Sequence, residues 1–290
     1  SAPPRLSLHD WPSPEQAVTQ HLILAIVQQS VLLFMGLLLL VQGAAKEVGY
    51  WLGHRRTARG DAPGEGVGVV VGGMLGLLAF VLALTLSFAS ARFQERRDGA
   101  LAEANAIGTS WLRAEAVGHP RGVEIARLLE DYIQVRMDFV RADAHSTDID
   151  AINARSNALQ SQMWGHVAAI VREQPNPVST ALMTSLNETF DLATAERFAF
   201  TIGFPTQLFW LLIGMALLCM AALGFQLGLR QRPLRLLSML LIGMWTVTIT
   251  SILDLGSART GEIRVPTVAY EWTLQGFRGG VTIPPAPAPR

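Results

Sequence analysis

Cysteine, lysine and charge are all scarce in this 290-residue chain. Cys219 is its only cysteine, which excludes an internal disulfide framework, a cysteine-rich zinc site and a cysteine-ligated iron–sulfur cluster. Lys46 is the only lysine, and basic and acidic residues balance at 23 each, so the basic excess that nucleic-acid binding requires is missing. Charged residues make up 16% of the chain and hydrophobic residues 50%. This composition is too apolar for an ordinary soluble enzyme.

Apolar residues gather in four long runs, at 22–45, 67–91, 207–229 and 234–253. Each run supplies the roughly 20 residues of helix that the hydrocarbon core of a bilayer requires. Arg235 is the only charged residue within them, and it lies at an end, where its side chain can reach the headgroups. The sequence therefore predicts four transmembrane helices, with the lipid bilayer as the first partner.

The residues between the second and third runs have a different pattern. Apolar residues such as Ile125, Leu129 and Tyr132 recur at helical spacing, with charged residues on the other faces. Helix starts are predicted at Thr147–Asp150 and at Asn176-Pro177. The expected fold is all-α: an integral membrane protein with four transmembrane helices and an extramembrane helical bundle between spans two and three.

Five segments are expected on this basis. They are an N-terminal segment at 1–21, spans one and two at 22–91, the helical domain at 92–205, a hairpin of spans three and four at 206–253, and a tail at 254–290. The tail is rich in glycine and proline, and no helix is expected in it.

The distribution of arginine bears on the orientation of the chain in the membrane. Four spans place both termini on one side. The two short loops are basic, with Arg55, Arg56, Arg230 and Arg232 among their residues, which favours a cytoplasmic location for these loops and an outward-facing helical domain. Three arginines directly after span two, at 92, 96 and 97, favour the opposite orientation.

Enzyme motifs are absent from the sequence. No histidine lies at the centre of a run, which excludes a bis-histidine haem within the bundle. Asp143, His145, Asp148 and Asp150 lie close together, but their spacing matches no ligand template. No nucleophile elbow or phosphate-binding loop is present. We therefore predict no catalytic residue, no metal and no cofactor.

Small and polar residues within the runs are more informative. Gly68, Gly72 and Gly76 recur at intervals of four, which predicts either close helix packing or a face toward a pore. Thr246 and Thr250 have the same interval, and their hydroxyls either bond to carbonyls of their own helix or line a hydrated pathway. Gln28 and Gln29 interrupt span one, with an interhelical hydrogen bond or the same pathway as the alternatives.

The segment from the end of span two into the helical domain carries a specific resemblance. It reads Arg92-Phe93-Gln94-Glu95-Arg96-Arg97, then Glu103-Ala104-Asn105-Ala106-Ile107-Gly108-Thr109, then Leu112-Arg113. This segment resembles the bacterial bestrophin-like domain family, and Tyr132, Arg136 and Phe139 continue the similarity. Glu103, Asn105, Thr109 and Arg113 are its motif positions. The spacing of Arg96 and Glu103 places them on one helix face, where an ion pair with another helix or another subunit is the simplest expectation. The alternative is a ring of Arg92 and Arg96 that concentrates anions at a pore mouth.

The resemblance implies a homo-oligomeric channel for small anions with span two lining the pathway. Candidate pore or selectivity residues are then Arg92, Arg96, Phe80, Phe88, Gln28 and Gln29. No acidic cluster follows span four, so calcium gating has no support. Bestrophins hold the domain between spans two and three in the cytosol, contrary to the loop-charge argument. The alternative function is a non-catalytic accessory or scaffold subunit of a larger membrane complex.

Overall fold

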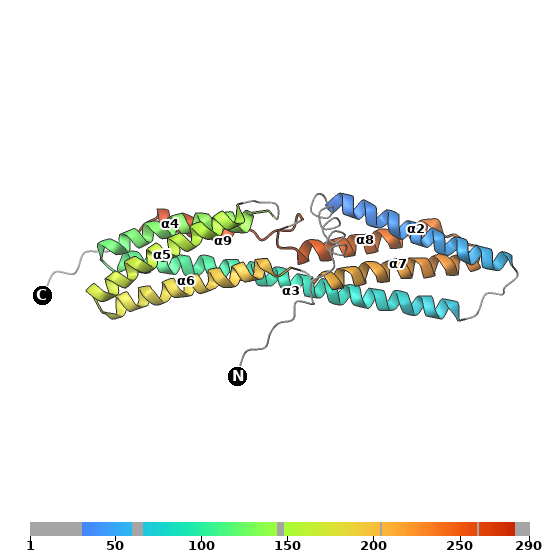
Figure 1. Cartoon of the computed structure of the whole chain (residues 1–290), viewed down its shortest axis with the longest axis horizontal. Coiled ribbons are helices and arrows are strands. Elements are labelled where there is room, and N and C mark those ends of the chain that lie inside the picture. Colours follow the sequence, from blue (N-terminus) through green and yellow to red (C-terminus); the bar gives the residue numbers. More distant parts are fainter. Residues whose placement is uncertain (1–30, 60–65, 144–147, 204, 260, 282–290) are drawn as a thin grey trace, which may run out of the picture. The chain divides into compact units, whose positions relative to one another are not determined.

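The computed structural model describes residues 31–59, 66–143, 148–203, 205–259 and 261–281. Within these residues the chain is helical, with no strand. The helices are α2 (Val31–Ala58), α3 (Val67–Ala116), α4 (Pro120–Arg141), α5 (Ile149–Glu173), α6 (Pro177–Thr201), α7 (Thr206–Leu229), α8 (Arg235–Gly256) and α9 (Val268–Arg278), coloured along the chain in Figure 1. The predicted all-α fold class is confirmed.

Four helices are long and apolar enough to cross a membrane: Val31–Ala58, Val67–Ala116, Gln207–Leu229 and Arg235–Gly256. They correspond to the four predicted spans. The helix of span two continues without a break to Ala116, as the family motif suggested. The described part of the first span begins at Val31, so Gln28 and Gln29 lie outside the described residues.

Two compact units divide the chain. The first comprises the described residues of Ser1–Ser87, Pro205–Asp254 and Thr260–Glu262. In it α2 packs lengthwise against α7 (Figure 1). The second comprises those of Phe88–Phe204, Leu255–Arg259 and Ile263–Arg290, where α4 packs against α5 and α9, and α5 against α6.

Glycine produces the close contact between α2 and α7. A Cβ on Gly49 would lie 2.0 Å from the Ala221 carbonyl oxygen, and one on Gly224 would lie 2.0 Å from that of Lys46. Gly53 and Gly228 make equivalent backbone contacts one turn further along. Such contacts let two backbones approach, which is the main source of helix association in lipid.

The polar side chains within the spans bond to backbone carbonyls and, in one case, to each other. Thr246 and Thr250 each donate a hydrogen bond to the carbonyl four residues earlier, over 2.8 Å, so the expectation of intrahelical bonding is confirmed for both. The Gln42 side chain is fully buried and donates to Thr246 Oγ1 over 2.9 Å. This bond joins α2 to α8.

Of the two predicted helix starts in the second unit, that of α6 follows from side-chain capping. The Asn176 side chain accepts from the Ser179 N–H over 2.9 Å, and the Ser179 hydroxyl accepts from the Asn176 N–H. This reciprocal pair confirms the predicted start of α6. α5 begins at Ile149, with Asp148 in the capping position and no side-chain cap bond, while Thr147 lies outside the described residues.

The C-terminal tail was expected to contain no helix, and this expectation is wrong. Residues 268–278 form α9, in which Tyr270 and Phe277 are buried. Their spacing, with Leu274 between them, makes one apolar helix face. Glu271 in the first turn and Arg278 in the last complement the helix dipole. The surrounding glycines and prolines hid this short amphipathic segment.

Candidate functional site

Two glycines of the α3 stripe, Gly72 and Gly76, have no close neighbour in the described part of the chain. A Cβ at either position would meet none of the described residues within 4 Å. Gly68 differs, since its Cβ would lie 3.1 Å from Gln226 Nε2. The described helices of the same chain therefore provide no close packing for Gly72 and Gly76, and packing against another subunit or a face toward a pore stays a prediction. The face that they form is open.

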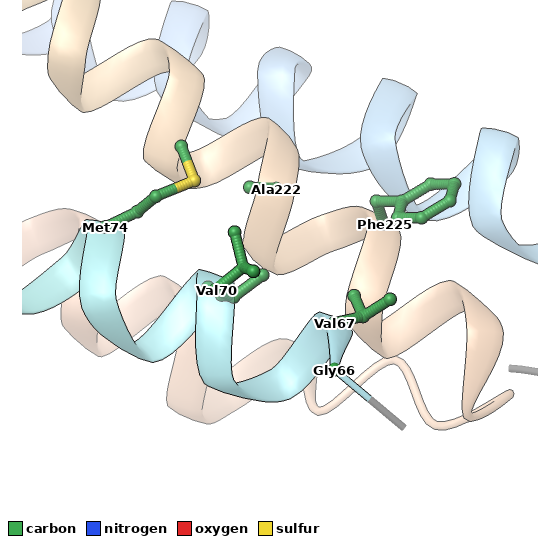
Figure 2. A pocket seen from close by; sticks show the side chains of 7 residues that line it. Gly66, Val67, Val70, Met74, Ala222 and Phe225 are labelled. Atoms are coloured by element: carbon green, nitrogen blue, oxygen red, sulfur yellow. The ribbon is translucent and has the colours of Figure 1, made fainter. Parts of the chain in front are cut away.

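Beside the start of this stripe lies an apolar groove of about 470 Å³. Figure 2 shows Val67, Val70 and Met74 of α3 facing Ala222 of α7. Gly66, Val71 and Phe225 complete the lining. The groove contains no charged lining residue, so it offers no chemistry beyond apolar contact.

Phe80, Phe88 and Arg92 lie further along α3. Phe80 is 60% exposed and Phe88 is 39% exposed. The Arg92 guanidinium lies 5.3 Å from the centre of the Phe88 ring, and it donates to Glu95 Oε2 over 2.9 Å. All three side chains therefore remain accessible in the single chain.

Arg96 is buried inside the second unit, so the expectation that it faces a pore is wrong. Only 1% of the residue is exposed. Its Nη2 donates to the carbonyl oxygens of Leu255, over 2.7 Å, and Ser257, over 3.2 Å. Arg96 thereby holds the end of α8 and the residues after it against α3.

Glu103 forms an ion pair between helices, as expected from its position on α3. Its carboxylate accepts two hydrogen bonds from Arg136 of α4, at 2.5 Å from Nε and 3.0 Å from Nη2. The Tyr270 hydroxyl of α9 donates to the same carboxylate over 2.8 Å. All three side chains are at most 2% exposed, so this triad joins three helices in the core of the second unit.

The electrostatics of the triad favour a charged pair. Burial opposes the charge on Arg136, but Glu103 outweighs burial and raises the pKa of the guanidinium above its usual range. Burial, followed by Glu103, raises the pKa of the Tyr270 hydroxyl well above its usual value. Tyr270 therefore stays protonated and acts only as a donor.

The other motif residues lie at the surface or bind backbone. Asn105 and Thr109 are exposed on α3. Arg113 donates to the carbonyl oxygen of Ala181 on α6 over 2.9 Å. Of the four motif positions, Glu103 and Arg113 therefore bond α3 to other helices, whereas Asn105 and Thr109 face outward from the single chain.

Sequence reasoning missed Glu196 and Tyr270. Glu196 of α6 is 1% exposed, and its Oε2 would lie 2.1 Å from a Cβ on Gly99. Burial, then Glu103, raises the pKa of its carboxyl to about 8, against the opposing effect of Arg136 and Arg96. One pattern in the sequence could have indicated that Glu196 is buried. It continues the helical spacing of the buried positions Leu182, Leu186, Thr189 and Ala193.

These features define a helical, multi-span membrane protein whose family motif forms its domain core. A family model, the bestrophin-like domain, matches residues 43–270. The chain belongs to this family. Among curated proteins, none matches it.

Solved structures support the same fold. A variant of a bacterial bestrophin homologue from Klebsiella pneumoniae is similar with a TM-score of 0.67 at 14% identity, covering 86% of this chain and 98% of that one. A second structure of a bacterial bestrophin homologue from Klebsiella pneumoniae has a TM-score of 0.64 at 15% identity, covering 87% and 100%. The similarity therefore spans nearly the whole of each neighbour.

Proposed function

We propose that this protein is a homo-oligomeric channel for small anions in the bacterial inner membrane, with α3 lining the pathway. The observation that carries the proposal is the open face at Gly72 and Gly76, which no described residue of the same chain covers. Membership of the bestrophin-like family supports it, because the family resemblance implies a pathway lined by the second span.

The contrast between two sets of glycines strengthens the argument. Gly49 and Gly224 lie in backbone contact between α2 and α7, so close packing within the subunit is already provided there. Gly72 and Gly76 have no such role. Small residues at a pathway keep it wide and expose the helix backbone to water and ions.

Two accessible phenylalanines on α3 suit a constriction. Rings of apolar side chains gate channels by excluding water when narrow. Phe80 and Phe88 are both exposed in the single chain, as side chains facing a pathway between copies would be. In this proposal they form the narrow part.

Arg92 is the residue proposed to favour anions. Its side chain is 37% exposed, and copies of it around an oligomer axis would concentrate anions at one entrance. Glu95 lies 2.9 Å away and offsets part of this charge. Arg96 has no part in the proposed entrance, because its side chain is buried.

The proposal predicts a change of ion selectivity in Arg92→Glu. The purified protein is reconstituted in planar bilayers, and the reversal potential is recorded in asymmetric chloride. The wild type is expected to favour chloride, and Arg92→Glu to shift the reversal potential toward that of the cation, because the ring charge changes sign.

Arg97→Glu is the matched control. Arg97 is exposed on α3 but lies five positions further along, which turns it to a different helix face. An equal shift in both variants would indicate a general surface-charge effect and reject Arg92 as the selecting residue. A silent preparation that purifies as a stoichiometric heteromeric complex would reject the channel in favour of an accessory subunit.

A further inference from the structure

Glu196 lies against one face of α3. Arg96, Gly99 and Glu103 occupy that face at spacings of three and four residues. Gly99 provides the space, because a Cβ there would lie 2.1 Å from Glu196 Oε2. Two contacts hold the preceding turns of α6 in place. Ser110 of α3 bonds to Thr189 over 3.0 Å, and Arg136 of α4 donates to the Ala193 carbonyl over 3.5 Å.

Two buried polar atoms at this place lack partners. Neither Glu196 Oε1 nor Arg96 Nε has a hydrogen-bond partner among the described residues. Both residues are only 1% exposed. A buried polar atom without a hydrogen-bond partner costs free energy. Glu196 Oε1 is an acceptor and Arg96 Nε is a donor, so a second arrangement in which they bond to each other would satisfy both atoms.

The charged and titratable groups around Glu196 come from α3, α4 and α9. Glu95, Arg96 and Glu103 act on it from α3, Arg136 from α4, and Tyr270 of α9 is affected by it in turn. No charged group of α5 is among its main electrostatic neighbours in the described chain. Glu103 already neutralises Arg136, so Arg96 is the cation left for Glu196.

We propose that Glu196 and Arg96 form a proton-binding switch within the second unit. With a proton on the Glu196 carboxyl, Arg96 holds the carbonyl oxygens of Leu255 and Ser257. When that proton passes to solvent, the carboxylate accepts a hydrogen bond from Arg96 Nε and draws the guanidinium away from those carbonyls. The site binds a single proton. The proton controls whether Arg96 of α3 keeps its hydrogen bonds to the carbonyl oxygens of Leu255 and Ser257.

The direction of the pH response follows from burial. The pKa of the Glu196 carboxyl rises from its ordinary value of 4.5 to about 8 in the folded protein. The folded state therefore binds a proton that the unfolded chain has released, and this proton stabilises the fold. The stabilisation is complete below about pH 4.5 and is lost as the pH rises through about 8.

Infrared difference spectroscopy on the full chain in detergent tests the proton site. Between about pH 6 and about pH 10, the wild type is expected to lose one protonated-carboxyl band per chain. Glu196→Gln, which has the shape of the protonated form, is expected to lack this change. Glu188→Gln, at an exposed position of the same helix, is expected to retain it.

Hydrogen exchange tests the second half of the switch. After correction for intrinsic exchange rates, amides at 255–259 of the wild type are expected to lose protection above about pH 8, and those of Glu196→Gln to keep it. A wild type without a titrating carboxyl band overturns the proposal even if the variant does not fold. Equal loss of protection in both proteins overturns the link to Arg96. Neither measurement involves ion conduction, so the outcome is independent of the proposed channel.

Discussion

Arg136→Met is expected to lower the free energy of unfolding by about 3–5 kcal/mol, which is the usual cost of removing one partner of a buried ion pair. The substitution leaves the Glu103 carboxylate at 0% exposure with only the Tyr270 hydroxyl as a donor. The loss is measured as a lower thermal midpoint of the detergent-purified protein, together with a reduced yield of folded chain. The double variant Arg136→Met, Glu103→Gln should recover part of the lost stability, because it no longer has a buried carboxylate without a cation.

Arg141→Met provides the matched comparison on the same helix. Arg141 also pairs with a glutamate, Glu271, but both side chains are about half exposed. Exposed pairs contribute about 0–1 kcal/mol, so this variant should be nearly neutral. If Arg136→Met lowered the free energy of unfolding as little as Arg141→Met, the buried triad would not be a main source of stability in the second unit.

The second large effect is expected at the α2–α7 contact. Gly49→Ala and Gly224→Ala each place a Cβ 2.0 Å from a backbone carbonyl oxygen of the facing helix. Because backbone cannot move aside as a flexible side chain does, the helices must separate. The cost for each variant should reach or exceed the upper part of the range of about 1–3 kcal/mol for overpacking.

Gly43→Ala on α2 and Gly214→Ala on α7 control for the change of residue type. Neither added Cβ meets an atom within 4 Å. Alanine favours a helix over glycine by about 1 kcal/mol, so these controls should be neutral or slightly stabilising. The measurement is the thermal midpoint in one detergent at one pH. A similar decrease in all four variants would contradict the close-contact interpretation.

The spans were predictable because membrane insertion depends on local composition. Long apolar runs identify a transmembrane helix without knowledge of its partners. The start of α6 was likewise predictable, because Asn176 and Ser179 satisfy backbone groups within three residues of each other. Fold class and helix ends of this kind depend on short stretches of sequence and can be predicted from them.

The core of the second unit was not predictable in the same way. Glu103 has Arg96 seven residues away, yet it binds Arg136 and Tyr270, which are 33 and 167 residues away. Spacing along one helix indicates which residues share a face, but packing between helices determines which of them meet. Gly49 with Gly53, and Gly224 with Gly228, have the same interval of four as Gly68 and Gly72, so their pairing required knowledge of which helices are neighbours.

The pairing of α2 with α7 has a consequence for biosynthesis. Thr57 and Leu229, which are bonded at the end of this contact, are 172 residues apart in the chain. At translation rates of about 5–20 residues per second, α2 leaves the ribosome about ten to thirty seconds before its partner. During this interval the glycine face of α2 has no α7 to pack against, and Gln42 has no Thr246 of α8 to donate to. The nascent chain therefore depends on the insertion machinery, or on the surrounding lipid, to hold α2 in the membrane until α7 is inserted.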